Sequence, residues 1–192
     1  MMKRLFVAST FVLALAACGG DAGPTGSRQL ALPEGPPSAT IYPSGSIWSI
    51  FATQTPTSTL AGIGEVGTRF YTTQEGAVIG LRFWQAAGES GTHVIKLWTD
   101  SGALLSTRTV TTTGSGWKTA YFTGIRGLAD STYYRVSVNI NSHYVRSTGA
   151  FSGPISNGPL VATSGYYGSP AGSMPTQPTA DNVFVDLIFQ VN

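Results

Sequence analysis

The chain has 192 residues, with 11 lysines and arginines against 9 aspartates and glutamates and a formal net charge of +2 at pH 7. Two of the cations, Lys3 and Arg4, lie in the first 17 residues, which leaves nine cations and nine anions in a formally neutral remainder. This balance excludes the basic runs of a nucleic-acid-binding protein, and a single cysteine excludes an intramolecular disulfide.

Residues 1–17 predict an export signal. Lys3 and Arg4 supply its positive start, and the apolar run that follows, LFVASTFVLALAA, is too short to span a membrane. Directly after it, Leu15–Cys18 reads LAAC and resembles the bacterial lipobox, whose cysteine receives a diacylglycerol before the preceding peptide bond is cut. We therefore expect a lipoprotein held at the membrane by acyl chains such as palmitate on Cys18. The alternative is an ordinary secretory signal beside an incidental cysteine.

The residues after Cys18 predict the location and a linker. Gly19 follows the cysteine, in place of the aspartate that resembles an inner-membrane retention signal, so we expect the cell envelope, and the outer membrane in a host that has one. Residues 18–42 are rich in Gly, Pro, Ala and Ser and lack an apolar period, which is typical of a flexible tether. The folded domain is expected at residues 43–192, long enough for a stable core without disulfides.

Residues 43–192 alternate like β-structure almost throughout. Turn sequences such as TDSGA, TTGSGW and NINSH separate the β-rich runs. The runs are SIWSIFA, GTRFYT, AVIGLRFW, THVIKLWT, ALLSTRTV, WKTAYFT, TYYRVSVNI, HYVRS and NVFVDLIFQV. No window of a dozen residues has apolar positions at helical spacing. These features predict an all-β fold of about nine strands, an antiparallel β-sandwich or jelly roll.

One glycine-rich stretch, GIGEVG at Gly62–Gly67, has the spacing of the dinucleotide-binding fingerprint. That fingerprint requires a buried strand before it and a helix after it, so that the helix N-terminus meets a pyrophosphate. Here a polar stretch with a proline precedes the glycines, and an alternating run follows them. We therefore expect no nucleotide, and no cofactor of any other kind.

A series of short segments gives the domain a family resemblance. They are GTRF (67–70), GLRFW (80–84), GTH (91–93), LW (97–98), LL (104–105), SGW (115–117), TYY (132–134), HY (143–144), NGPL (157–160), MP (174–175) and VFVDLIF (183–189). In this order they resemble the bacterial domain of unknown function 4082, from about Ser46 to the C-terminus. The resemblance implies a β-sandwich of secreted or surface proteins, often beside immunoglobulin-like or carbohydrate-active modules, with no established activity. It also implies that Gly67 begins a strand and that GIGEVG is a turn.

Candidates for a catalytic or metal site are sparse. The sequence has no G-x-S-x-G, no H-E-x-x-H and no cluster of cysteines and histidines. The remaining candidate bases and ligands are His93, His143, Glu89 and Asp186. A hydrolase would require these four to converge in one pocket. Sparse histidines more often bond loop backbone, so we expect a protein without catalytic activity and without a bound metal.

Asp186 lies between apolar residues in VFVDLIF, on the strand face opposite to Val185 and Leu187. A carboxylate in such surroundings must be paired or solvated. Arg82 and Arg135 occupy other alternating runs, which favours a structural ion pair with one of them. The alternatives are an acceptor for sugar hydroxyls and a ligand of a structural Ca²⁺.

The aromatic residues indicate a possible binding face. In alternation, Trp84 falls on the same strand face as Arg82, and Trp98 on the same face as Lys96. The opposite faces, predicted to be core, carry Leu81, Phe83, Ile95 and Leu97. Tryptophans beside cations are typical of a sugar-binding face, where rings stack on pyranose C–H groups. The face could be extended by Tyr71, Tyr121, Tyr166 and Tyr167, the last two in a predicted loop at Gly165–Pro170.

Two functions are compatible with these patterns. The first is a lipid-anchored, non-catalytic envelope module that binds carbohydrate or another surface component. The second is a structural or protein-interaction module of the envelope without glycan binding. The first requires the aromatic side chains on an open face, and the second requires them buried, with an apolar or edge-strand patch elsewhere. In both, the lipid makes the membrane a partner.

The lipobox generates a direct test. In a bacterial host, Cys18→Ser should abolish incorporation of labelled palmitate and leave the signal uncleaved, because acylation of the cysteine precedes the cut. The measurement is labelling of the wild-type and variant chains, followed by mass spectrometry of their N-termini. Normal cleavage of the Cys18→Ser chain would instead identify an ordinary secretory signal.

Overall fold

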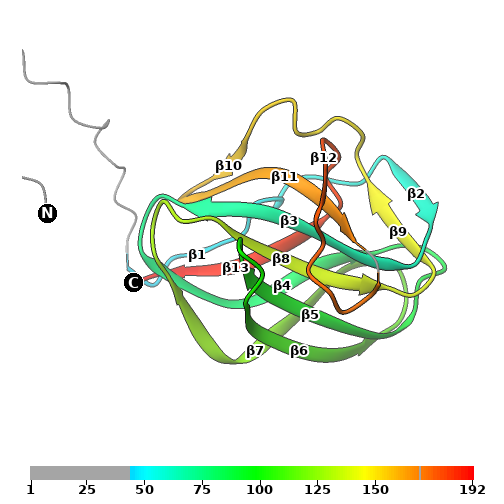
Figure 1. Ribbon diagram of the computed structural model, residues 1–192, viewed down its shortest axis with the longest axis horizontal. Coiled ribbons are helices and arrows are strands. Elements are labelled where there is room, and N and C mark those ends of the chain that lie inside the picture. Colours follow the sequence, from blue (N-terminus) through cyan, green and yellow to red (C-terminus); the bar gives the residue numbers. More distant parts are fainter. Residues whose placement is uncertain (1–43, 169) are drawn as a thin grey trace, which may run out of the picture. The chain divides into compact units, whose positions relative to one another are not determined.

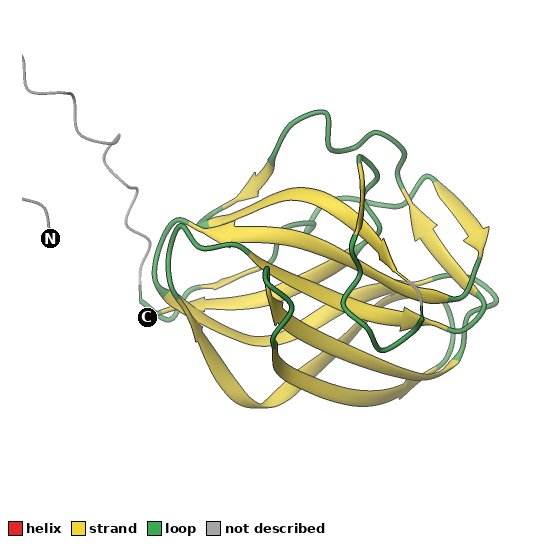
Figure 2. Ribbon diagram, viewed as in Figure 1, coloured by secondary structure: helices red, strands yellow, loops and turns green. Residues whose placement is uncertain are grey.

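The computed structural model describes residues 44–168 and 170–192, which form 13 β-strands and no helix (Figure 1, Figure 2). The all-β prediction is therefore confirmed. The predicted signal at residues 1–17, the lipidation site Cys18 and the tether at residues 18–42 lie outside the described residues. Within the described ranges, no helix is long and apolar enough to cross a membrane.

The strands form an antiparallel β-sandwich (Figure 1). The four-stranded sheet runs in the order β1 (Ile47–Trp48), β13 (Val185–Val191), β4 (Gly76–Gln85) and β7 (Gly116–Leu128). The seven-stranded sheet runs β10 (Ile155–Asn157), β11 (Leu160–Gly168), β3 (Gly64–Thr72), β8 (Tyr134–Ile140), β5 (Gly91–Thr99) and β6 (Leu104–Thr112), with β12 (Gln177–Thr179) paired to β11. A small third sheet pairs β2 (Ser58–Ala61) with β9 (His143–Arg146).

Each of the nine predicted runs contains a strand, and the strands missed are β2, β10, β11 and β12. The loop predicted at Gly165–Pro170 is wrong, because Gly165–Gly168 ends strand β11. Two features hid this strand. A bulge between Ala162 and Ser164 breaks the alternation, and at Gly165 a side chain would collide with the carbonyl oxygen of Asp181. The strand therefore shows no continuous period-two alternation and contains a glycine where its neighbours leave no room for a side chain.

The core lies between the two main sheets. The predicted core residues are confirmed, since Leu81, Ile95 and Leu97 are fully buried and Phe83 is 3% exposed. Other fully buried large side chains are Phe70, Leu160, Leu187 and Phe189. Burial of each such side chain stabilises the fold by about 1.5–3 kcal/mol. The core therefore fixes which face of every strand is turned outward and is available to a site.

The stretch GIGEVG has a structural role. Strand β3 begins at Gly64 and not at Gly67, so only Gly62 and Ile63 belong to the preceding turn. Gly64 has a φ of +139°, and the carbonyl oxygen of Gly168 occupies the space of a side chain there. Gly67 lies within the strand, where Val136 and Pro175 leave no room for a Cβ atom. The glycines thus allow close backbone packing, and a strand, not a helix, follows them.

Asp186 fixes a loop to the outer face of the four-stranded sheet. Its carboxylate is fully buried and accepts hydrogen bonds from the backbone amides of Ile50 (2.8 Å) and Phe51 (2.9 Å). Arg82 donates to it from Nε (3.0 Å) and Nη2 (2.8 Å). Burial raises the pKa of Asp186 above its ordinary value, although Arg82 and the two backbone amides act in the opposite direction. The predicted ion pair is confirmed with Arg82, whereas Arg135 lies on the other sheet.

Removal of this carboxylate should destabilise the fold. Asp186→Ala leaves Arg82 without its counter-ion and two loop amides without an acceptor, so the free energy of unfolding should fall by about 3 kcal/mol or more. Urea denaturation of both proteins measures the difference. The control is Glu75→Ala, at an exposed carboxylate without an ion pair among the described residues, which should change stability by less than about 0.5 kcal/mol. Equal effects in the two variants would refute the role of Asp186.

Candidate functional site

The two predicted platform tryptophans do not share a face. Trp84 lies in β4 of the four-stranded sheet and Trp98 in β5 of the seven-stranded sheet. Trp98 is only 7% exposed, and its indole Nε1 donates a hydrogen bond to the Ser137 hydroxyl at 2.8 Å. The prediction of Trp98 as an open stacking surface is therefore wrong. The alternation of residues along a strand shows which of its side chains share a face, but it does not show which of the two sheets the strand joins.

Trp84 is half-buried in a small aromatic cluster. Its ring lies 5.5 Å from that of Trp117 and 6.3 Å from that of Phe184, centroid to centroid. The Arg82 guanidinium, which Asp186 holds, covers the Trp117 ring at 4.1 Å. Tyr121, in β7 of the same sheet, is 59% exposed. Trp84 and Arg82 are thus occupied in packing, and Tyr121 is the open ring among the predicted site residues of this sheet.

The open aromatic side chains of the seven-stranded sheet gather on its outer face. We define the arginine–tyrosine surface as Arg69, Tyr71, Asp100, Tyr133, Arg135 and Tyr166. Strands β3, β8 and β11 supply four of these residues, Tyr133 directly precedes β8, and Asp100 follows β5. The Tyr133 residue is 37% exposed, and Tyr71 and Tyr166 are half-buried. Two of the predicted site residues, Tyr71 and Tyr166, therefore belong to one surface.

Asp100 ties the arginines of this surface together. It accepts from Arg69 Nε at 3.1 Å and Arg69 Nη2 at 2.9 Å, and from Arg135 Nε at 2.8 Å. The hydrogen bonds from Arg69, with those from Arg135, hold the pKa of Asp100 below its ordinary value against the opposing effect of burial. Arg135 Nη1 also donates to the Pro175 carbonyl at 2.9 Å. The two guanidinium planes are thus held in fixed positions.

Each of these arginines lies on a tyrosine ring. The Arg69 guanidinium carbon is 3.6 Å from the Tyr133 ring centroid, and that of Arg135 is 4.1 Å from the Tyr166 centroid. Tyr71 meets Tyr133 edge to face, with centroids 5.3 Å apart. The surface therefore offers tyrosine rings next to a carboxylate and two guanidinium groups, which suit the C–H faces and the hydroxyls of a sugar.

A buried polar network supports the surface from the strands beneath. Lys96 is 5% exposed and its Nζ lies 2.9 Å from Glu65 Oε1. The Ser137 hydroxyl donates to the same carboxylate at 2.6 Å, and the amide of Gly172 donates to it at 2.8 Å. Lys96 was expected on an open face beside Trp98, but both side chains are covered and paired. The outer face of this sheet is thus covered at Lys96 and Trp98, and its arginines and tyrosines are more open to solvent.

Tyr167 does not join the arginine–tyrosine surface. Tyr167 follows Tyr166 in β11, and successive residues of a strand project to opposite faces of the sheet. The Tyr167 hydroxyl donates to Asp181 Oδ2 at 3.3 Å, and its ring lies 5.6 Å from that of Tyr144. Burial raises the pKa of Tyr167. The prediction that both tyrosines extend one platform is therefore wrong, because they belong to a strand and not to a loop.

Three of the four catalytic candidates come together, and their contacts are structural. Glu89 accepts from the amides of Asn141 (2.8 Å), Ser142 (2.8 Å) and His143 (2.7 Å) and from the Ser142 hydroxyl (2.8 Å). Burial raises the pKa of Glu89, but these donors outweigh it and lower the pKa below its ordinary value. The carboxylate therefore clamps the turn between β8 and β9.

The two histidines lie beside this clamp. His93 is fully buried, with Nδ1 3.1 Å from the Asn139 carbonyl and Nε2 3.7 Å from Glu89 Oε1. His143 Nδ1 lies 3.0 Å from the hydroxyl of Ser142. Asp186 lies elsewhere, under its own loop on the four-stranded sheet. Within the described residues, no group of three or more His, Cys, Asp or Glu side chains could hold a metal ion. The four-residue convergence that a hydrolase required is therefore not formed.

Sequence reasoning missed Arg69, Asp100, Tyr133 and Arg135 as site residues, and named Arg135 only as a candidate partner of Asp186. A signal was present, because Arg69 has the same parity as Tyr71 in GTRFYT, and Tyr133 the same as Arg135 in TYYRVSV. Both runs pair an arginine with a tyrosine on one strand face. The position of Asp100, in the turn between β5 and β6, carried no comparable signal.

A comparison with protein families identifies the family of the domain. The model of a family described as "Domain of unknown function (DUF4082)" matches residues 52–185. Four of the short segments that gave the sequence its family resemblance, GTRF, LW, TYY and MP, meet at the arginine–tyrosine surface or directly beneath it. No protein of curated function matches the chain significantly.

The arginine–tyrosine surface should depend on the charge of Asp100. A carboxyl with a lower pKa in the folded than in the unfolded chain contributes full stability above the unfolded pKa of about 4, and this stability is lost as the pH falls through the folded pKa. Asp100→Asn should therefore lower the free energy of unfolding at pH 7 by about 1 kcal/mol and reduce the further loss on acidification. Denaturation curves at pH 7 and pH 3 measure both effects. The control is Asp130→Asn, at an exposed carboxylate without an ion pair among the described residues. The assignment fails if this control and Asp100→Asn have the same pH dependence.

Proposed function

The chain belongs to the DUF4082 family, and we propose that it is a non-catalytic module of the cell envelope that binds carbohydrate. The observation that carries the proposal is the arginine–tyrosine surface, in which tyrosine rings and guanidinium groups alternate on one sheet face. Rings of this kind cover the apolar face of a sugar, and charged groups beside them orient its hydroxyls. Lipid attached to Cys18 would hold the module at the membrane.

The surface suits binding because its side chains are already fixed. Asp100 joins Arg69 to Arg135, and each arginine lies on its own tyrosine. A ligand then has fewer rotamers to order on binding, which lowers the entropic cost of association. Tyrosine has only two side-chain torsions, so it gives a large contact area for little lost freedom.

The carboxylates of the domain support a non-catalytic role. A glycoside hydrolase needs two carboxylates that flank the scissile bond, one of them free to donate or accept a proton. Here Glu65, Asp100 and Asp186 are each bonded to a cation, and Glu89 is occupied by four donors of one turn. These groups are engaged in holding strands and loops together.

One observation favours the second hypothesis, a protein-interaction module. Strand β6 has β5 as its partner and ends the path of the seven-stranded sheet, so one side of its backbone faces no other strand among the described residues. Its Leu104 is 49% exposed. An edge of this kind can accept a strand from another protein. This edge is the alternative to the arginine–tyrosine surface.

Retention on insoluble polysaccharides tests the proposal. The chain from residue 18 onward, with Cys18→Ser to omit the lipid, is applied to cellulose, chitin, xylan and peptidoglycan. We expect saturable retention on at least one polymer. Tyr133→Ala and Tyr166→Ala should each weaken it about tenfold, which corresponds to roughly 1.4 kcal/mol for a lost stacking contact. The matched control is Tyr121→Ala, at an exposed ring on the other sheet, which should bind like the parent chain.

The outcomes separate the hypotheses. If all three variants are retained as strongly as the parent chain, the arginine–tyrosine surface is not the binding site. A loss confined to Tyr121→Ala would move the site to the four-stranded sheet. Absence of retention on every polymer would contradict binding of these polysaccharides by the arginine–tyrosine surface and would favour the β6 edge as the functional surface.

A further inference from the structure

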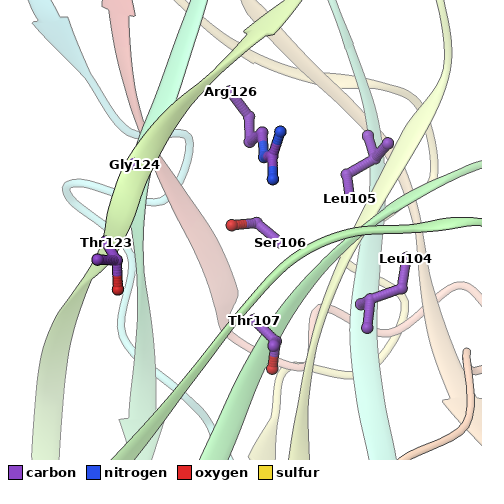
Figure 3. Close-up of a pocket in the computed structure, with 7 residues that line it drawn as sticks. All are labelled: Leu104, Leu105, Ser106, Thr107, Thr123, Gly124 and Arg126. Carbon is purple, nitrogen blue, oxygen red and sulfur yellow. The ribbon is translucent and has the colours of Figure 1, made fainter.

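A cleft opens along one side of the sandwich, between edge strands β6 and β7. Each has a single strand partner among the described residues, β5 and β4 respectively. The cleft has a volume of about 320 Å³ and is lined by Leu104, Leu105, Ser106, Thr107, Thr123, Gly124 and Arg126 (Figure 3). Figure 3 shows the Arg126 guanidinium and the Ser106 hydroxyl directed toward the same space. This cleft is separate from the arginine–tyrosine surface.

One arginine, Arg126, lines the cleft, and a second, Arg108, lies beside it on the opposite sheet. Arg126 is paired across the strands with Val78, and Arg108 with Ile95. Both partners are fully buried in the core, and directly paired residues share a sheet face, so both arginines project from the inner faces of their sheets. At the edge strands these faces open toward each other. Arg108 Nη1 donates to the hydroxyl of Thr123, in the opposite wall, at 3.3 Å.

These arginines differ from most other cations of the domain. Five cations each lie 2.8–2.9 Å from a carboxylate oxygen: Arg69, Arg82, Lys96, Arg135 and Arg146. In the part of the chain that the structure describes, the cations without such a partner are Arg108, Lys118 and Arg126. All three lie on β6 or β7. Uncompensated positive charge is therefore concentrated on this side of the sandwich.

The chemistry of the cleft fits a sugar that carries a carboxylate. A guanidinium group presents paired N–H donors that match the two oxygens of a carboxylate. The hydroxyls of Ser106, Thr107 and Thr123 can bond sugar hydroxyls. Leu104 and Leu105 add apolar surface for the C–H face of a ring. The volume lies at the low end of the range of about 300–1,000 Å³ for small-ligand clefts.

We propose that the cleft between β6 and β7 binds a uronic acid unit of an acidic polysaccharide, with Arg108 and Arg126 on its carboxylate. The inference rests on the proposed function and deepens it by naming a ligand class and a second contact site.

The test compares two ligands that differ only in charge. Calorimetry measures binding of tetragalacturonate and of its fully methyl-esterified form to the chain from residue 18 onward with Cys18→Ser. We expect the acid to bind at least about tenfold more tightly than the ester. Arg126→Gln and Arg108→Gln should each lower the affinity for the acid about tenfold, which is the loss expected for one charge-assisted hydrogen bond. Neither variant should change the affinity for the ester. The control is Lys118→Gln, which removes a positive charge from the same side of the sandwich at a residue that does not line the cleft, whereas Arg108 is bonded to the lining residue Thr123.

Three results would overturn the proposal. Equal binding of the acid and the ester would exclude recognition of the carboxylate. An equal loss of affinity for tetragalacturonate in Lys118→Gln would show that the arginines act only through general electrostatic attraction, which salt screens. Displacement of tetragalacturonate by inorganic phosphate at equal concentration would identify a site for small anions or lipid phosphates instead. Each result leaves retention on neutral polysaccharides, and its dependence on Tyr133 and Tyr166, as a separate test of the proposed function.

Discussion

Each main sheet carries on its outer face a carboxylate that is shielded from water and must be paired there. Asp186 on the four-stranded sheet is bonded to Arg82 and to the amides of Ile50 and Phe51. Glu65 on the seven-stranded sheet is bonded to Lys96 and to the amide of Gly172. In both cases a loop closes over the ion pair and supplies a backbone donor. An unpaired charge in either place would cost several kcal/mol, so these pairs fix the course of the loops that cover the sandwich.

This constraint decides which outward side chains are left for a ligand. Trp98 and Lys96 have the alternation expected of an open face, yet both are covered because they belong to the network of Glu65. The arginine–tyrosine surface lies on the same sheet face, where Asp100 keeps a 30% exposed side chain. The cleft at β6 and β7 lies where, among residues 44–168 and 170–192, no carboxylate neutralises the cations. The proposed binding sites are thus the places that the buried ion pairs leave open.

The sequence predicts the strands well and their assembly poorly. Period-two alternation located nine strands and the core residues Leu81 and Ile95, because burial of one face imposes that period. It missed β11, whose glycines allow close packing and carry no pattern. It also placed Trp84 with Trp98, since parity does not tell which sheet a strand joins. The arginine–tyrosine surface escaped for the same reason, as Arg69 and Asp100 are 31 residues apart and meet only through the strand order.

The strand order also relates the two proposed contact sites. Strands β8, β5 and β6 are consecutive neighbours, and at about 4.8 Å per strand Arg135 on β8 is separated by roughly 10 Å from the edge that borders the cleft. Between them the outward positions of β6 are Thr107, Thr109 and Thr111, all exposed. Thr107 also lines the cleft. These neutral hydroxyls form a row along β6, of which Thr107 is the end at the cleft, and none of them carries a charge that opposes an anionic chain. A polysaccharide long enough to cross two strands would gain from both sites at once, because binding at one raises the effective concentration of its next units at the other.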